Sequence, residues 1–484
     1  MFTKIQKYLL LNHPIIWNTK FFPMLVFGFI FNILFFGLGY LNGTINFQEY
    51  YNSDSIALPM IFGILTIILT FIVWLVFYFK NNSLKSFYKK SNYALFYEWL
   101  QVFTIIVVFV SFFLTFNFGK QLHQKSYFSE TELKERCKTI AQANIFIDGS
   151  FAQTEIDTLK SNFDTINPEN QKIVYKDYIV YRGKKYDAYS LLNRNIVEFS
   201  IFNHNFKNHE IEVKNWLVSD NKQAVKNLMT QYLNLIKEHK LKTNLSLNQW
   251  FTAVYNYPDF TNFLYIKDKY YNENQYYPED YYEEGRVQTA NKYSNLYVQQ
   301  SLLRSNYDNI SEAHTEPFIE LESILLVLYI SLVVSLLILS FRVTSGKSWL
   351  ISLVVFGVLQ IIFALSSVLI SDGYTYFIES LVVIAIVKIY FFSIYKRKKS
   401  KQFSAIALNL FLNSFFWSVP IIYILITNYY RKICDFDTSS INCPEYTWLK
   451  DNFELMMLYN FIFCVLSLVI LFKIIRNWKG ISEE

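Results

Sequence analysis

The sequence predicts an all-α membrane protein with eight transmembrane helices, three before and five after one inserted extracytoplasmic domain of mixed, mainly helical structure. Hydrophobic residues make up 52% of the chain and charged residues only 17%. A spanning helix needs about 20 mainly apolar residues. Runs of that kind are Phe21–Tyr40, Leu58–Phe79, Trp99–Phe118, Ile324–Phe341, Trp349–Ile370, Tyr376–Tyr395, Phe403–Thr427 and Phe453–Ile474.

These runs divide the chain into three parts. Residues 1–118 form an N-terminal membrane unit of one interfacial segment and three helices, and residues 323–484 form a C-terminal membrane unit of five helices. Residues 119–322 form the extracytoplasmic domain, which is long enough to bury a core of its own. Its 24 basic and 27 acidic residues nearly balance, so no nucleic-acid partner is expected.

Basic residues in the short loops predict the orientation, because Lys and Arg concentrate on the cytoplasmic side of a membrane. With a cytoplasmic N-terminus, the short inside segments hold 17 basic residues and the short outside loops hold 3. Both termini are therefore expected in the cytoplasm, and the protein in a bacterial plasma (inner) membrane. The first run lacks a cleavage pattern and is interpreted as an uncleaved signal anchor.

The weakest run is Tyr376–Tyr395, because it contains Glu379 and Lys388. Without this span, the basic stretch Lys396–Lys401 would face outward and break the charge rule. We therefore retain the span and expect Lys388 to extend toward the cytoplasmic headgroups, about two turns away.

Local patterns predict several elements in the inserted domain. Ser129 precedes acidic residues and is a plausible N-cap of a helix that runs to Asn144. Apolar residues at helical spacing predict an amphipathic helix over Asn221–His239. Alternation and turn residues predict a hairpin near Lys172–Tyr181. Two further helices are expected at Ser246–Tyr255 and Asn291–Asn309.

Cys434 and Cys443 lie nine positions apart in one external loop, where disulfides persist. A bridge between them is the favoured interpretation, because a zinc site would need two more ligands and no His lies nearby. Cys464 lies in a span and is expected to be a packing residue, and Cys137 a buried free thiol.

Two regions of the insert hold groups that could bind a ligand. His204 and His209 could form a metal pair, but their spacing matches no ligand motif. An acidic, tyrosine-rich stretch could bind calcium or a sugar, although a solvated loop requires no special assumption. Its acidic residues are Asp259, Asp268, Glu273, Glu279, Asp280, Glu283 and Glu284. No metal or other cofactor is predicted.

Few polar residues lie inside the spans. They are Asn32, Gln360, Asn409, Asn413 and Asn460, together with Lys388. One interpretation is that they join helices by hydrogen bonds, and the other is that they line a polar substrate path. Glu98, Asp372, Glu379 and Lys388 are the ionisable residues in or beside spans and lie near interfaces, which argues against a proton-relay pump.

No catalytic motif is found in the sequence. Ser345–Ser348 resembles the end of a phosphate-binding loop, but the required upstream glycine is absent. The expected cytoplasmic loops are also too short for a kinase or an ATPase. An enzymatic function is therefore not expected, and any energy source must be a partner or a gradient.

The N-terminal segment carries an apolar strip with Ile5, Leu9 and Ile16, while Lys4 and Lys7 remain available to anionic headgroups, so it can lie in the cytoplasmic interface as a short amphipathic helix. It resembles the elbow-type helix before the first span of permease subunits in ATP-driven exporters. Such permeases also lack a nucleotide motif and carry large external inserts. Their common pattern has six spans with the insert after the first, whereas this chain has eight with the insert after the third.

Two functional hypotheses follow from this layout. The first is a multi-pass, permease-like or accessory subunit of an ATP-driven export complex, which contacts membrane lipid and a cytoplasmic ATPase subunit. The alternative is a membrane receptor, sensor or assembly scaffold that binds a ligand or an envelope protein through its extracytoplasmic domain.

Overall fold

The computed structural model describes residues 2–50, 54–80, 93–147, 151–152, 177–203, 206–268, 293–370, 373–397, 401–436 and 443–479. Contacts between Cα atoms divide the chain into two compact units, each composed of several segments. The membrane unit comprises Met1–Gly39, Ala57–Phe118 and Ile319–Glu484. The insert unit comprises Tyr40–Ile56 and Gly119–Phe318. Each unit is described here by itself.

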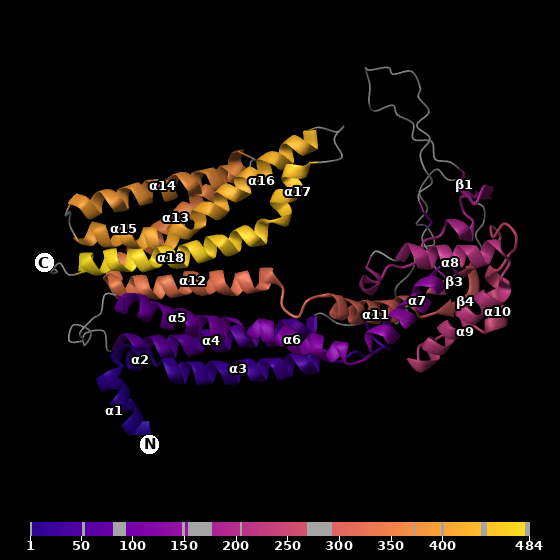
Figure 1. Cartoon of the computed structure of the whole chain (residues 1–484), viewed down its shortest axis with the longest axis horizontal. Coiled ribbons are helices and arrows are strands. Elements are labelled where there is room, and N and C mark those ends of the chain that lie inside the picture. The colour runs from indigo at the N-terminus through magenta and orange to yellow at the C-terminus, as the bar shows by residue number, and fades with distance from the viewer. Residues whose placement is uncertain are drawn as a thin grey trace, which may run out of the picture. The chain divides into compact units, whose positions relative to one another are not determined.

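Eight helices in the described residues are long and apolar enough to cross a membrane, which confirms the eight predicted spans. The helices that form them are α3 (Phe21–Asn42), α4 (Asp54–Lys80), α5 (Ala94–Val110), α6 (Phe112–Lys125), α12 (Leu321–Val343), α13 (Gly346–Ile370), α14 (Gly373–Arg397), α15 (Lys401–Ser414), α16 (Ser418–Phe436) and α18 (Phe453–Lys479). Figure 1 shows them in chain order. The weakest predicted span is present as Tyr374–Ser393, with a mean hydropathy of 1.8.

Two short helices precede the first span. These are α1 (Phe2–Asn12) and α2 (Pro14–Thr19), and the proline at the first position of α2 separates them. Lys20 ends α2 in the left-handed conformation, and its Nζ lies 3.8 Å from the ring centroid of Trp17. The predicted interfacial segment is therefore helical, with a sharp turn before the first span.

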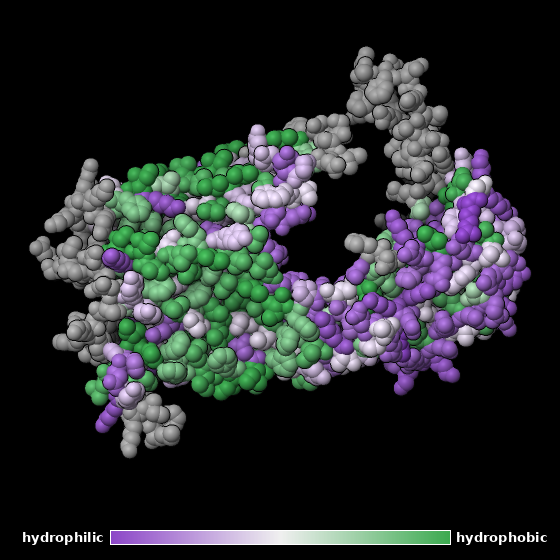
Figure 2. Space-filling model, in the orientation of Figure 1, coloured by the Kyte–Doolittle hydropathy of each residue, from purple (hydrophilic) through white to green (hydrophobic). Residues whose placement is uncertain are grey.

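Helix α5 packs directly against α12, although 211 positions separate Val110 from Leu321 in the sequence. Trp99 of α5 is completely buried at this contact, and its Nε1 donates to the Ser335 hydroxyl at 3.0 Å. Apolar side chains of α12, α15 and α18 continue the same core. The visible outer face of the membrane unit is largely hydrophobic (Figure 2), as expected for a surface in contact with lipid.

Small residues allow α3 to approach α5 and α6 closely. A Cβ at Gly39 would lie 2.0 Å from the carbonyl oxygen of Phe116, so the two backbones meet there without space for a side chain. A Cβ at Gly28 would lie 2.6 Å from Val108. Close backbone contact of this kind is typical of packed membrane helices.

The insert unit contains helices and two small sheets. Its elements are α7 (Glu130–Asn144), β1 (Tyr178–Tyr181), β2 (Lys184–Asp187), η3 (Leu191–Asn193), η4 (Ser200–Phe202), α8 (Phe206–Val218), α9 (Lys222–Glu238), α10 (Leu247–Val254), β3 (Tyr265–Asp268), β4 (Tyr293–Val298) and α11 (Gln300–Thr315). Strands β1 and β2 form the predicted antiparallel hairpin, whereas β3 and β4 pair in parallel. Figure 2 shows a mainly hydrophilic surface here.

Several predicted elements of the insert are confirmed and one is partly wrong. The Ser129 hydroxyl accepts from the Glu132 amide and caps α7, and Asn221 caps α9 in the same way. The helix predicted over Asn291–Asn309 begins only at Gln300, because the preceding residues pair with β3 as a strand.

The segment between the first two spans belongs to the core of the insert unit. The backbone N–H of Ile45 donates to the Tyr127 hydroxyl at 2.8 Å. The side-chain Nδ2 of Asn306 donates to the carbonyl of Phe47 at 3.4 Å. The Phe47 ring stacks on His239, with centroids 3.9 Å apart. Burial in this cluster lowers the pKa of His239 to about 4.

Candidate functional site

The seventh span is interrupted near its midpoint. Hydropathy treats Ser404–Cys434 as one span, but α15 ends at Ser414 and the 3₁₀ turn η5 (Phe415–Trp417) precedes α16. Pro420 explains the interruption, because proline has no N–H and its ring clashes with the carbonyl four residues earlier. The carbonyl of Phe416 therefore needs a donor from elsewhere. We call residues 413–420 the span-7 break.

A side chain from α18 supplies that donor. The amide Nδ2 of Asn460 donates to the carbonyl of Phe416 at 3.1 Å and to the Tyr329 hydroxyl at 2.7 Å. The Tyr329 hydroxyl in turn donates to the carbonyl of Met457 at 3.0 Å. Helices α12 and α18 therefore hold the irregular backbone in place, as required where the membrane offers no water.

A lysine also reaches the span-7 break. The Nζ of Lys388 in α14 donates to the Ser418 hydroxyl at 2.5 Å, and this hydroxyl donates to the carbonyl of Phe415 at 3.1 Å. Lys388 thus points to the neighbouring helix, and its expected extension toward the headgroups is not observed. Among the residues that the structure describes, no carboxylate forms an ion pair with Lys388.

Asn413 lies in the last turn of α15 and is the first residue of the span-7 break. Its Nδ2 atom is buried and has no hydrogen-bond partner among the described residues. A buried donor without a partner costs about 1–3 kcal/mol. Of the six intramembrane polar residues predicted from the sequence, Asn413 therefore belongs to the span-7 break, and Lys388 and Asn460 donate hydrogen bonds to it.

The other three form separate contacts between helices. Asn32 donates from α3 to the carbonyl of Val108 at 2.6 Å, beside the interruption between α5 and α6. Asn409 of α15 and Thr344 exchange hydrogen bonds at 3.0 and 3.3 Å. Gln360 of α13 accepts from the Tyr376 hydroxyl of α14. These contacts join α3 to α5, the end of α12 to α15, and α13 to α14, and do not form one path.

Sequence reasoning missed a buried ion pair between α5 and α12. The Arg342 guanidinium contacts the Glu98 carboxylate, and their side chains are only 3% and 11% exposed. The Tyr78 hydroxyl donates to Glu98 at 3.0 Å, and the Arg342 guanidinium carbon lies 4.2 Å from the Tyr78 ring centroid. In the amide orientation that satisfies both of its side-chain polar atoms, the side-chain oxygen of Asn18 in α2 accepts from Arg342 at 2.9 Å. We call these four residues the α5–α12 knot.

The 17 basic residues counted in the inside segments include Arg342, whereas the structure buries this side chain. When Arg342 is left out of the count, the inside segments still hold far more basic residues than the short outside loops. The signal that could have found the knot is a glutamate in the second turn of one span and an arginine in the last turn of another. That signal names two residues but not their pairing, which depends on how α5 packs on α12.

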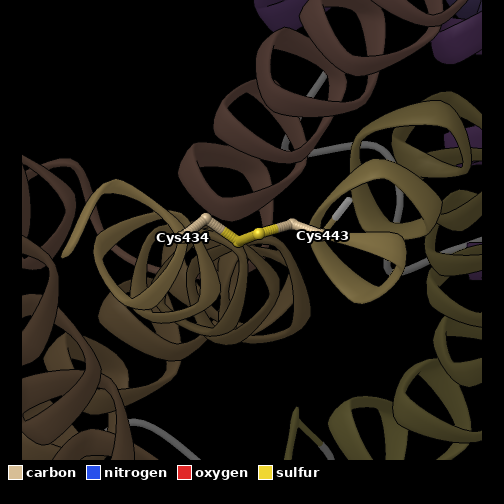
Figure 3. Close-up of a disulfide and its surroundings, with 2 residues drawn as sticks. All are labelled: Cys434 and Cys443. Atoms are coloured by element: carbon tan, nitrogen blue, oxygen red, sulfur yellow. A yellow bond between two sulfur atoms is a disulfide. The ribbon is translucent and has the colours of Figure 1, made fainter. Parts of the chain in front are cut away.

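Cys434 and Cys443 form a disulfide that joins the end of α16 to the start of α17 (Pro444–Asp451) (Figure 3). Their Cα atoms are 6.1 Å apart. Cys137 and Cys464 are buried free thiols, and burial raises the pKa of Cys137.

The ligand sites considered in the insert gain no support. His204 lies outside the described residues, as do Glu273, Glu279, Asp280, Glu283 and Glu284. Asp259 pairs with Lys184 at 3.3 Å, and Asp268 accepts from the first amides of α11. Within the described ranges, no three His, Cys, Asp or Glu residues group as metal ligands.

In comparisons with protein-family models, curated proteins and solved structures, nothing matches this chain significantly. The class of the protein therefore rests on its own geometry. Eight apolar helices indicate a multi-pass membrane protein.

Proposed function

We propose that the protein is a permease-like or accessory subunit of an ATP-driven export complex in a bacterial plasma membrane. The observation that carries this proposal is the span-7 break with Lys388 beside it. Interrupted helices near the membrane midplane form substrate sites in transporters, and an ionisable side chain inside a span marks a functional site by default. A helix bundle with only a structural role needs neither feature.

The proposed orientation places both termini in the cytoplasm and the insert outside. The segment Tyr40–Ile56 packs into the insert unit, so both must lie on one side of the membrane, as two intervening spans require. The disulfide supports an external position for the loop after α16, because disulfides persist in oxidising compartments. Accessibility of tags at residue 484 and in the insert tests this topology, and an insert reached only from the cytoplasm would overturn it.

The energy source is proposed to be a separate ATPase, because the chain has no nucleotide-binding motif. Helices α1 and α2 form a bent element before the first span, in agreement with the elbow-like arrangement of exporter permeases. The basic loops Lys80–Lys90 and Lys396–Lys401 are the proposed docking sites, and they lie largely outside the described residues.

Affinity purification of the full chain in a mild detergent tests the partner. An ATPase should co-purify with the wild type and be lost when lysines of these two loops are replaced by glutamine. Glutamine at Lys184 and Lys185 of the insert hairpin is the matched control, since it removes surface charge from the other unit. A protein that purifies alone, with a phenotype unaffected by the loop changes, contradicts the proposal.

A receptor, sensor or assembly scaffold remains the second candidate. It is favoured by the separate core of the insert unit, built around buried residues such as Trp250, Tyr232 and Tyr307, and by the helix-joining roles of Asn32, Gln360 and Asn409. Because Ile45 and Phe47 belong to this core, the full chain and not residues 119–322 should serve as bait. Specific capture of one envelope protein or ligand, without an ATPase, would favour this function.

A further inference from the structure

We propose that the span-7 break binds the anionic group of an amphiphilic cargo, with Lys388 as the countercharge and the amide of Asn413 as a second donor. The ligand is a carboxylate or phosphate attached to an apolar chain that stays in the lipid. This inference rests on the proposed export function, because it names the class of substrate that the site accepts.

The first argument is that Lys388 has no carboxylate partner among the described residues. A lysine within a transmembrane helix is costly, up to roughly 2.5–3.5 kcal/mol at the helix centre on insertion scales. Lys388 lies nine residues before the end of α14, roughly 14 Å along the helix axis at 1.5 Å per residue. Its described hydrogen bond is to the neutral Ser418 hydroxyl, so an anionic ligand would add the opposite charge that intramembrane lysines normally pair with.

The second argument is the set of donors within the span-7 break. The buried Nδ2 of Asn413, five residues before Ser418, has no partner in the described part of the chain. Helix α16 begins at Ser418 and runs for 19 residues, so its positive dipole end also lies at the break. Half-helix N-termini of interrupted spans bind anionic substrate groups in this manner.

The third argument is the apolar surface around the break. Trp417 is 36% exposed, Val419 39% and Ile389 71%. Lys388 itself is partly exposed, so a ligand can reach it from the lipid side without crossing the helix core. An amphiphile fits this surface because its tail remains in hydrocarbon while its charged end meets Lys388. A wholly polar substrate would gain nothing from these exposed side chains.

The test uses the purified full chain in neutral maltoside micelles. The free-acid probe is oleate, with oleyl alcohol as its uncharged analogue, and the lipid probe is dioleoyl phosphatidylglycerol, with dioleoyl phosphatidylcholine as its zwitterionic analogue. Ligand-dependent unfolding temperatures give an apparent Kd. A thiol-reactive dye can report unfolding, because Cys137 and Cys464 are buried free thiols.

We expect at least one anionic probe to bind more tightly than its analogue. A charge-assisted hydrogen bond contributes enough that Lys388→Met should weaken binding at least roughly 10-fold. Lys388→Arg should retain most of the affinity, and Asn413→Leu should weaken it less than Lys388→Met. The matched control is Lys347→Met, which removes an exposed lysine at the start of α13 and should leave binding unchanged.

The pattern of probes identifies the source of the anion. Binding of oleate indicates a free acid, and binding of phosphatidylglycerol indicates a lipid phosphate. The inference is overturned if neither anionic probe exceeds its analogue, or if Lys388→Met binds as well as the wild type. Co-purification of an ATPase is a separate readout, so loss of the export proposal and loss of this site are distinguishable.

Discussion

Replacement of Arg342 by methionine tests the ion pair of the α5–α12 knot. The Arg342 and Glu98 side chains are 3% and 11% exposed, so removal of the guanidinium leaves a carboxylate that water hardly reaches. Loss of one partner from a buried pair costs about 3–5 kcal/mol, because the remaining charge is uncompensated. We expect R342M to lower the free energy of unfolding by that amount, about 3–5 kcal/mol.

The second single variant and the double variant complete a thermodynamic cycle. E98M should destabilise by a similar amount, since it leaves the arginine charge in the same enclosed space. Replacing both charges with apolar groups of similar volume is often neutral, but here it also removes the Glu98 acceptor of the buried Tyr78 hydroxyl. E98M/R342M should therefore cost about 1–3 kcal/mol, well below the sum of the two single variants. The cycle then gives a coupling energy of several kcal/mol between two residues that are 244 positions apart.

Reversible unfolding of the full chain in mixed maltoside and SDS micelles, followed by circular dichroism, measures these free energies. Lys347→Met is the control, because this lysine is exposed and should change the stability by less than about 0.5 kcal/mol. Single variants that each cost less than about 1 kcal/mol, or a double variant whose cost equals their sum, would refute the buried pair.

Three further predictions concern packing, pH and the disulfide. Gly39→Ala should destabilise the protein by about 1–3 kcal/mol, because its Cβ would lie 2.0 Å from a backbone oxygen of α6. Gly37→Ala is the control, because nothing lies within 4 Å of a Cβ at that position. Equal effects of the two variants would contradict the close packing at Gly39. The pKa of His239 is lowered from 6.5 to about 4 in the folded protein, so its contribution to stability is present above pH 6.5 and is lost as the pH falls toward 4. Unfolding temperatures measured at pH 7 and pH 5 should therefore differ more for the wild type than for His239→Gln. Identical differences for the two proteins would argue against burial of His239. The Cys434–Cys443 disulfide closes a short loop, and its reduction should lower the free energy of unfolding by about 2–3 kcal/mol. A thiol dye that already labels both cysteines before reduction would show that the bridge is absent.

The eight spans could be predicted from the sequence because lipid imposes a simple requirement on length and polarity. Even the weak span with Glu379 and Lys388 was found, since loop charges decided it. The hairpin and the Ser129 cap were predictable for a similar reason, because turn chemistry and capping depend on neighbouring residues. In each case a local rule or the lipid environment determined the structure.

The two features that define the candidate site differ in how far the sequence could reveal them. Pro420 was a usable local signal for the span-7 break, because a proline inside a long apolar run interrupts the helix. For the knot, the positions of Glu98 and Arg342 near span ends named two residues but not their pairing, which depends on how α12 packs on α5. Strand β4 was missed for the same reason, because its pairing with β3 is tertiary.

Helix α12 connects the knot to the span-7 break. It contributes Tyr329 to the network at the break, Ser335 to the contact with Trp99, and Arg342 to the knot. Ser335 and Arg342 are seven residues apart and share the face toward α5, whereas Tyr329 faces α18. If α12 shifts as a rigid element, a displacement that separates Arg342 from Glu98 also moves the Tyr329 hydroxyl relative to Asn460. The Nδ2 of Asn460 donates to both the Tyr329 hydroxyl and the carbonyl of Phe416. A change in its bond to Tyr329 would therefore alter its bond to the break, and the break would change together with the knot.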